Sequence, residues 1–127
     1  MEYEVEAKAK QILESAYSLI KNPRIWIQED EARDSTGTAV DATDADACQF
    51  CALGAIDHVI FFASAADIST EQYVWESIAE RAFDLLAEGA SLVVNPDFRR
   101  QAIAQFNDKP LTTHRDVIDA YKAAIAS

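Results

Sequence analysis

The chain has 127 residues, half of them hydrophobic, with only three Gly and three Pro, which excludes a disordered chain and fits one domain with an ordinary core. Its 22 acidic residues outnumber 11 Lys and Arg and give a net charge of −11. Nucleic acid and anionic membranes are bound through cationic side chains, so this balance argues against both as direct partners and leaves a protein partner or self-association.

The amino terminus has no basic segment followed by an apolar one, so the sequence predicts no secretory signal and a cytoplasmic protein with reduced cysteines. The most apolar stretch covers residues 47–66 and holds Asp57 near its middle. Because a charge at that depth is costly in a bilayer, we interpret the stretch as a core helix and expect no membrane association.

The sequence pattern of the first third of the chain predicts one helix and one hairpin. Apolar residues recur every three or four positions over residues 3–21 and predict an amphipathic helix, which Asn22-Pro23 ends. Alternation around Ile25 and Ile27, followed by the turn signal at residues 34–37, predicts a small β-hairpin near 25–41.

The next segment is predicted to be the central helix of the fold. Thr43 and Asp46 have the spacing of a capping box, and the residues behind them are apolar nearly all round. The sequence therefore predicts a buried helix over about 44–65. Gly54 inside such a helix costs about 1 kcal/mol relative to Ala, which indicates close packing against another backbone.

Three further helices are predicted from their end signals. A capping box at residues 69–72 starts a helix that runs to about Glu88, with Gly89 as its carboxyl cap. The run at residues 95–97 combines a capping Asn, Pro at the first position and an acid, and predicts the start of the next helix. Residues 107–110 end it.

Thr113 and Asp116 form the capping box of the last helix. Since no repeat or linker divides the chain, we interpret residues 1–127 as one helical domain. The predicted fold is mainly α, with about five helices packed around a central apolar helix (about 44–65) and a small β-hairpin near 25–41.

Three pieces of the chain together resemble a known pattern. They are Trp26 followed by Ala32-Arg33-Asp34, then Phe50-Cys51-Ala52-Leu53-Gly54-Ala55, then Phe106-Asn107-Asp108 with Thr113, Asp116 and Val117. This order is similar to a family of small bacterial and phage proteins known only as a domain of unknown function. The resemblance covers roughly residues 10–125. It implies that Cys51, Asn107 and Asp108 belong to the shared pattern, and it implies no reaction.

Cys51 and His114 are the candidates for nucleophilic catalysis. A thiol needs a neighbouring imidazole to become a thiolate and a third group, such as Asn107, Asp108 or Asp116, to orient the ring. The alternative interpretation is a core cysteine, with Asn107 and Asp108 closing a helix end. Inside a helix that begins near residue 44, Cys51 gains little from the helix dipole, which favours the core interpretation.

Metal and redox chemistry find weaker support. Cys48 and Cys51 are spaced as Cys-x-x-Cys, but no strand–helix–strand pattern surrounds them. A zinc set of both cysteines with His58 and His114 lacks a second close pair of ligands. The acids at residues 41–46 lack the glycine and glutamate of a calcium loop. We therefore predict no metal and no cofactor.

Acidic surface is the remaining feature. Residues 28–46 hold seven acids and one base, and four acids recur every four residues along one predicted helix stripe: Glu76, Glu80, Asp84 and Glu88. A solvated face explains them, and so does a docking surface for a basic protein. The leading hypothesis is a non-enzymatic protein-interaction module. The alternatives are a small cysteine-dependent hydrolase or transferase using Cys51 and His114, and an acidic charge mimic that inhibits a basic or nucleic-acid-binding protein.

Overall fold

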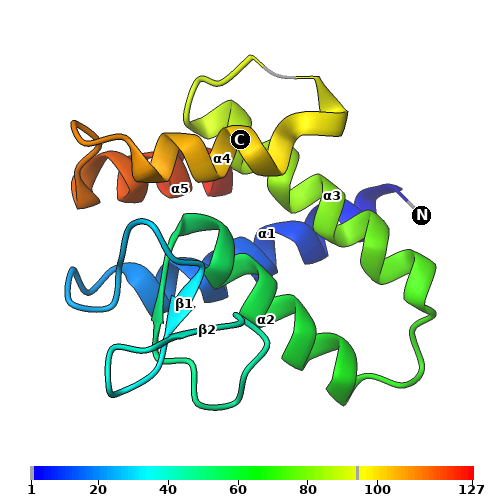
Figure 1. Cartoon of the computed structure of the whole chain (residues 1–127). Coiled ribbons are helices and arrows are strands. Elements are labelled where there is room, and N and C mark those ends of the chain that lie inside the picture. The colour runs from blue at the N-terminus through cyan, green and yellow to red at the C-terminus, as the bar shows by residue number, and fades with distance from the viewer. Residues whose placement is uncertain (1, 94) are drawn as a thin grey trace.

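The computed structural model describes residues 2–93 and 95–127. Within them the chain forms five α-helices, one 3₁₀ turn and three two-residue strands (Figure 1). In chain order these are α1 (Glu2–Ile20), β1 (Ala32–Arg33), β2 (Ala39–Val40), β3 (Gln49–Phe50), α2 (Ala52–Ala66), α3 (Gln72–Gly89), η1 (Pro96–Phe98), α4 (Arg99–Asp108) and α5 (His114–Ala126). The prediction of a mainly α fold with about five helices and a small hairpin is confirmed.

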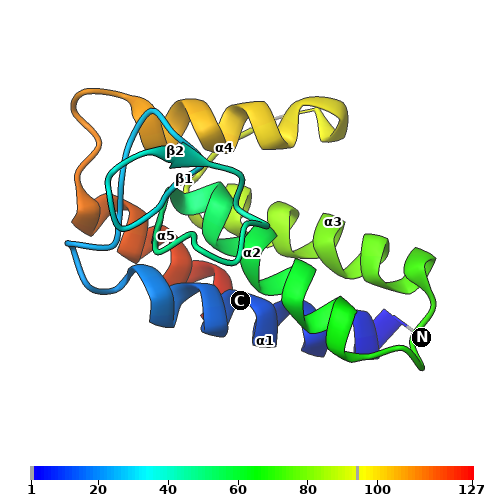
Figure 2. The same cartoon turned by 60° about the horizontal axis from the view of Figure 1, so that its bottom comes forward.

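The helices pack in a bundle. α3 packs along both α1 and α5, and α2 packs on α1 and α3. Figure 2 shows α1 and α4 on opposite sides of the molecule with α2 and α3 between them. The fully buried side chains of the core come from every helix, and the largest include Leu13, Ile56, Ile78, Leu85, Ile103 and Tyr121. No helix of the described residues is both long and apolar enough to cross a membrane.

The small sheet has the order β2-β1-β3, and both pairings are antiparallel. Ala32 lies between Val40 and Phe50. β1 and β2 form the expected hairpin, whose turn contains Gly37 at a φ of 83°. The pairing begins later than the alternation around Ile25 and Ile27 suggested. These two residues instead bond Phe50, with Ile27 N donating to its carbonyl and its amide donating to Ile25 O.

The predicted start of the central helix is wrong. The helix begins at Ala52, not near residue 44, because Phe50 is held in the sheet and Cys48 N donates to Arg33 O. Thr43 and Asp46 therefore cap nothing and lie in the loop before β3. Long-range strand pairing satisfies the backbone of residues 48–50, and it overrides the local preference for helix.

Only the first five residues of α2, Ala52–Ile56, are buried. Gly54 fits the prediction of close packing, because a Cβ built there would lie 2.0 Å from the carbonyl oxygen of Glu31. Beyond Ile56 the helix is partly buried or exposed along its length. The segment at residues 28–34 therefore lies across the amino-terminal end of α2.

Some of the predicted helix caps are present in the structure and others are not. Ser69 and Gln72 form no capping box: α3 begins at Gln72 after Glu71, and the hydroxyls of Ser69 and Thr70 donate to Asp67 instead. Gly89 is the last helical residue rather than a cap beyond it.

The amino-terminal caps of the last helical segments, η1 and α5, agree with prediction. The Asn95 side chain accepts from Asp97 N at the start of η1, and Thr113 with Asp116 forms the full capping box of α5. Gly89 has a packing reason of its own, because a Cβ there would lie 2.2 Å from Ala120 O on α5.

Candidate functional site

Cys51 is the amino-terminal cap of α2. Its Sγ accepts from Gly54 N at 3.2 Å, and the residue is 5% exposed. The position at a helix start is the one that favours a thiolate, in contrast to the helix-interior position expected from sequence. Burial nevertheless dominates and raises the pKa of the Cys51 thiol to about 11. The thiol is therefore held in its protonated, weakly nucleophilic form.

His114 is the first residue of α5 and faces a different partner. Its Nε2–H donates to Ile20 O at 2.7 Å, which ties the start of α5 to the end of α1. Its ring lies against Trp26, with centroids 5.8 Å apart. In the described residues the hydrogen bond to the Cys51 thiol comes from Gly54, and none comes from a histidine. The imidazole is thus engaged in joining helices.

Asn107 is fully buried on α4 and joins three separate segments. Its Oδ1 accepts from Trp26 Nε1 at 2.7 Å and from Ala52 N at 2.9 Å. Its Nδ2 donates to Ile27 O at 3.0 Å. A buried amide that satisfies a tryptophan, a helix amino terminus and a loop carbonyl fixes their relative positions.

Asp108 supports the same loop from the next position. Its Oδ1 accepts from Glu29 N and from Asn107 Nδ2. Glu29 has a φ of 77°, an uncommon conformation for a residue with a side chain. The bond to Asp108 holds that residue in place. Asn107 and Asp108 therefore do more than close a helix end, since together they fasten the loop before β1 to α4.

The loop is also tied within itself. Arg33 Nε donates to Asp30 at 2.7 Å, and its Nη2 donates to Gln28 O at 3.1 Å. Asp34 accepts from the amides of Thr36 and Thr38 in the hairpin turn. The three sequence pieces that carry the family resemblance thus meet around this loop, where Asn107, Asp108, Arg33 and Asp34 make the hydrogen bonds described above.

The two cysteines lie in different environments. Cys48 is exposed and Cys51 is buried, and both are free thiols. No group of three or more His, Cys, Asp or Glu side chains with metal-binding geometry occurs in the part of the chain that is described.

An open cleft of about 400 Å³ lies beside the exposed part of α2. Its walls come from the loop before β1, the segment after β2, α2 and the first residue of α3. The lining residues combine carboxylates with apolar and polar side chains: Glu31, Asp41, Ala42, Thr43, Asp57, Ile60, Phe61, Ser64 and Gln72. We call this the acidic cleft, because three of its residues are acids and none is Lys or Arg.

Glu31 and Asp57 form the electrostatic centre of the acidic cleft. Arg100 on α4 clasps both oxygens of Asp57, at 2.9 and 2.8 Å. A hydrogen bond to Asp57, then burial, then repulsion by Asp57 raises the pKa of Glu31 to about 7, while Arg100 acts in the opposite direction. The raised pKa of Glu31 makes it a candidate functional group, because perturbed pKa values are concentrated at functional sites.

Sequence reasoning missed this pair. Asp57 is the one acid in the apolar stretch over residues 47–66, and we had used it only as an argument against a membrane span. The sequence did offer a signal for Asp57. It is a single carboxylate in an apolar stretch, three positions after Gly54, which was expected to pack closely against another backbone. Glu31 carried no comparable signal, because its position depends on how the loop crosses α2.

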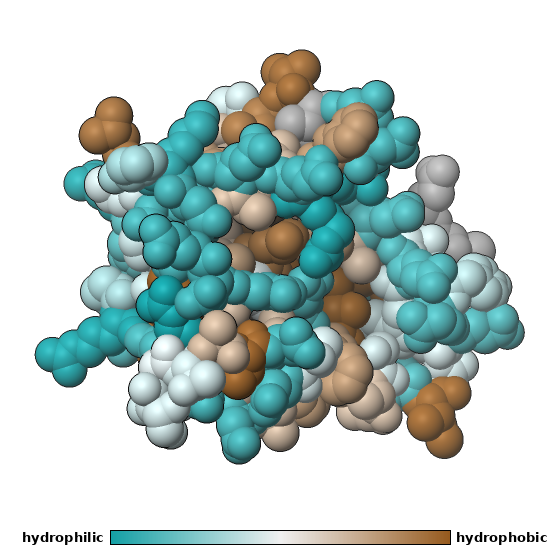
Figure 3. Space-filling model, viewed as in Figure 1, coloured by the Kyte–Doolittle hydropathy of each residue, from teal (hydrophilic) through white to brown (hydrophobic). Residues whose placement is uncertain are grey.

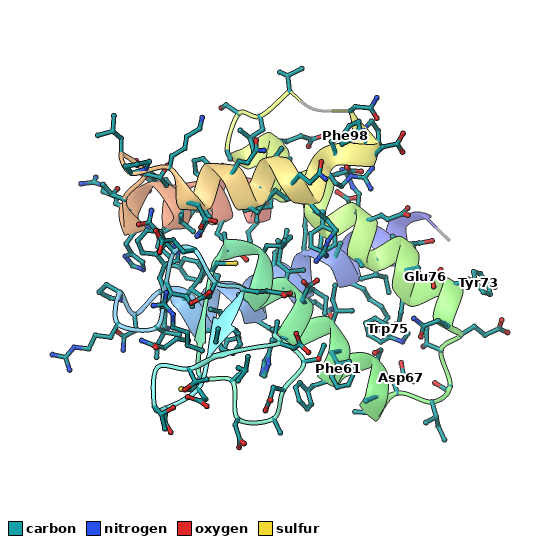
Figure 4. The ribbon with its side chains drawn as sticks, in the orientation of Figure 1. Phe61, Asp67, Tyr73, Trp75, Glu76 and Phe98 are labelled. Carbon is teal, nitrogen blue, oxygen red and sulfur yellow. The ribbon has the colours of Figure 1, made fainter. Side chains whose placement is uncertain are left out.

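Outside the acidic cleft, the exposed apolar and acidic side chains are more scattered than they are within it. Figure 3 shows a largely hydrophilic face on which hydrophobic side chains project singly. In Figure 4 Trp75 points inward from α3, whereas Tyr73 and Glu76 project outward and Phe61 lies on α2. Of the predicted acidic stripe, Glu76, Glu80 and Glu88 are exposed and Asp84 pairs with Arg99.

Comparison with known proteins adds a family and no activity. A model described as a family of unknown function (DUF6197) matches residues 5–127, nearly the whole chain. No curated protein and no solved structure matches the chain.

Proposed function

The chain belongs to DUF6197, a family of unknown function, and on that premise we propose that it is a non-enzymatic interaction module that docks a basic segment of a protein partner at the acidic cleft. The observation that carries the proposal is the lining of this cleft. Glu31, Asp41 and Asp57 place three carboxylates around one opening, and Arg100 compensates one of them.

The surroundings of the cleft extend the negative potential. Residues 57–80, which include most of α2 and the first half of α3, hold five acids and neither Lys nor Arg. A surface of one sign attracts a partner of the opposite sign and raises its association rate. The arrangement therefore favours a partner segment rich in Lys or Arg.

Phe61 gives the cleft a second mode of recognition. Its ring lines the cleft and is 45% exposed. A Lys or Arg side chain has an aliphatic stem that packs on an aromatic ring and a charged head that reaches nearby carboxylates. An aromatic ring beside carboxylates therefore suits these side chains better than it suits a simple cation.

The cysteine-dependent enzyme is the weaker candidate on the same geometry. A nucleophilic thiol requires a lowered pKa and access to solvent, and Cys51 has a raised pKa and is buried. The hydrogen bond that His114 donates to Ile20 serves helix packing.

The test is a titration of the ¹⁵N-labelled protein with a synthetic amphipathic peptide of Lys and Leu, followed by amide chemical shifts. We expect the largest shifts in residues 28–34, 41–43 and 57–64, and no binding of the same peptide with Glu in place of Lys. Asp41→Lys should weaken binding by about tenfold, corresponding to roughly 1.4 kcal/mol.

The matched control is Glu14→Lys, which makes the same charge change on α1, outside the cleft lining. It should weaken binding by no more than about threefold, because only long-range attraction is lost. Equal weakening by both variants, or shifts spread evenly over the surface, would show that the peptide senses net charge and not the cleft. Absence of binding at any pH between 6 and 8 would refute the proposal.

A further inference from the structure

The carboxyl-terminal half of α2 exposes two phenylalanines beside the acidic cleft. Phe61, labelled in Figure 4, is 45% exposed, and Phe62 is 40% exposed. Their rings meet edge to face, with centroids 5.1 Å apart. Residues 58–66 include no Asp, Glu, Lys or Arg. Because positions three and four apart share one face of a helix, His58, Phe61, Phe62 and Ala65 form one uncharged strip, which we call the aromatic stripe.

The aromatic stripe is anchored in the core through His58. The His58 ring lies between Phe50 and Phe62, with centroid distances of 4.6 and 4.7 Å. Its Nδ1–H donates to Ala42 O at 2.7 Å, and Phe50 is 2% exposed. Phe62 therefore packs on a ring that is itself fixed. A partner that binds the stripe has little side-chain motion to freeze, which lowers the entropic cost of binding.

Acids lie on both sides of the aromatic stripe. Asp41 and Asp57 of the acidic cleft lie beside its amino-terminal end. Beyond its carboxyl-terminal end, the turn after α2 and the start of α3 add further carboxylates: Asp67, Glu71 and Glu76. The first Lys or Arg after Asp57 is Arg81, which is paired with Glu6 on α1. The segment that best covers this surface is thus apolar along one face and positive at its edges.

The same charges decide between two possible occupants of the stripe. A second copy of the chain would bring its own acids against these acids, and like charges brought together at an interface cost affinity. A segment rich in Lys or Arg gains from every carboxylate that borders the stripe. Charge complementarity therefore favours a basic partner over self-association.

The helical nature of the surface also constrains the conformation of the partner. The backbone groups of α2 bond to each other, so its side presents side chains and no row of free N–H and C=O groups. An extended segment gains affinity by pairing with such a row, whereas an amphipathic helix lays side chains at i, i+3 or i+4, and i+7 on an apolar surface. The stripe runs from His58 to Ala65, about 10 Å or two helical turns, which matches that spacing.

We propose that the partner segment is a basic amphipathic helix, whose apolar side chains pack on the aromatic stripe and on Ile68 and whose Lys or Arg side chains reach the carboxylates of the acidic cleft. Ile68 is 97% exposed in the turn after α2 and extends the apolar surface by one residue. This inference rests on the proposed docking function and names the class of its partner. Apolar contacts supply the affinity of such a complex, and the charges set its orientation and association rate.

Two synthetic peptides of identical composition test the conformation of the partner. Both consist of about 14 residues of Lys and Leu, but in one the Leu residues recur every three or four positions, and in the other no face of a helix is apolar. NMR titration should show that the patterned peptide binds about tenfold more tightly, at concentrations where both peptides are monomeric. In a ¹³C-labelled patterned peptide, the Cα shifts should move to helical values when it binds the unlabelled protein.

A matched pair of variants tests whether the stripe makes the contact. Ile68 and Leu111 lie in turns and are 97% and 92% exposed, so replacing either by Ser should leave the fold unchanged. Ile68→Ser should weaken the patterned peptide by about fivefold, and Leu111→Ser by less than about twofold.

Phe62→Ser tests the stripe apart from the acidic cleft, because Phe62 belongs to the stripe and not to the cleft lining. It should reduce the affinity of the patterned peptide by about tenfold and leave that of the other peptide unchanged. Asp41→Lys, in contrast, should weaken both peptides alike, since it changes the charge of the cleft and not the stripe. An amide spectrum of each variant confirms that it is folded.

The helical partner is overturned by equal affinities of the two peptides, by bound Cα shifts that are extended, or by equal weakening in Ile68→Ser and Leu111→Ser. Amide shifts of the free protein that depend on its own concentration and are confined to residues 58–68 would make a second copy the occupant instead. A patterned peptide of Gln and Leu that binds as tightly would refute the requirement for a basic helix.

These failures are distinct from failure of the docking function. If the two peptides bind equally and Asp41→Lys still weakens binding more than Glu14→Lys does, the cleft binds a basic segment that is not a helix. If neither peptide binds, the docking function itself is refuted, and the inference about its partner fails with it.

Discussion

Asn107 shows how one side chain can organise a small domain. It is fully buried, and it serves a tryptophan from the loop before β1, the first amide of α2 and a loop carbonyl. Truncating it removes these three bonds and a fourth to Asp108 Oδ1, and it also leaves Trp26 Nε1 and Ala52 N without partners in a buried place. Leaving donors unsatisfied costs more than the bonds contributed.

We therefore expect Asn107→Ala to lower the free energy of unfolding by about 3–4 kcal/mol. Urea denaturation followed by circular dichroism measures it. Asn95→Ala is the control, since Asn95 is exposed and makes only a capping bond to Asp97, and it should cost about 1 kcal/mol or less. Equal losses in the two variants would contradict the role of Asn107 as a junction.

The two thiols should differ sharply in reactivity. Burial raises the pKa of Cys51 to about 11, so at pH 8 about one molecule in a thousand carries its thiolate, and the thiol is also shielded. Cys48 is exposed. We expect iodoacetamide to label Cys48 within minutes and Cys51 only after denaturant is added, as read by peptide mass spectrometry.

Fast labelling of Cys51 in the native protein would reverse this conclusion and make the cysteine-dependent enzyme the leading hypothesis. The contribution of Cys51 to stability also depends on pH, and the direction of the change is defined. Since the raised pKa of Cys51 keeps its proton in the folded state beyond the ordinary value of 9.0, its contribution to stability falls as the pH rises from 9 toward 11.

At the scale of elements, the crossing of the loop over α2 depends on a missing side chain. Gly54→Ala would improve helix propensity by about 1 kcal/mol. The added Cβ would however lie 2.0 Å from Glu31 O, against backbone that Cys51 N also bonds. We expect a net loss of about 2 kcal/mol or more in the free energy of unfolding, because the loop must move.

Gly37→Ala provides the contrast. Its Cβ would meet nothing within 4 Å, and only its φ of 83° opposes the change, so the cost should be about 1 kcal/mol. Thermal denaturation of both variants makes the comparison. A Gly54→Ala protein as stable as the wild type would mean that the loop does not press on α2.

Two similar capping patterns have different outcomes in the structure. Thr113 caps α5 through Asp116 N, and Asp116 accepts from Thr113 N in return. Thr43, with an acid at the same spacing, lies in a loop. Thr113→Ala should therefore cost about 0.5–2 kcal/mol, and Thr43→Ala should be nearly neutral, in paired urea titrations. Comparable effects would place a helix start at residue 43 after all.

At the scale of the whole molecule, a net charge of −11 is spread over a small domain. Exposed acids such as Glu76, Glu80 and Glu88 recur on one helix and repel each other. We expect the melting temperature to rise by about 3 °C or more when NaCl is increased from 10 to 300 mM at pH 7.5, because salt screens this repulsion.

Choline chloride at the same ionic strength should have the same effect, because screening does not depend on the cation. A melting temperature that is flat or falling with salt would show that ion pairs such as Arg100 with Asp57 outweigh the general repulsion. A rise with NaCl alone would indicate specific binding of sodium.

The sequence by itself determined what depends on neighbours along the chain. Amphipathic periodicity located α1 and α5, and the signals at Asn95 and Thr113 located two helix starts, because a cap and its helix lie within four residues of each other. The mainly α class and the close packing of a backbone at Gly54 were predicted from the same local chemistry. The Asn107-Asp108 pair was visible as a pattern, although its role was not.

Only the tertiary structure decided what depends on distant partners. Residues 49–50 are a strand because Ala32 pairs with Phe50, and that pairing moved the start of α2 to Ala52 and made Cys51 its cap. Glu31, Asp57 and Arg100 are far apart in sequence and meet because the loop crosses α2 beside α4. The pKa of Glu31 is raised only at that crossing, because charge coupling depends on separation in space and on burial.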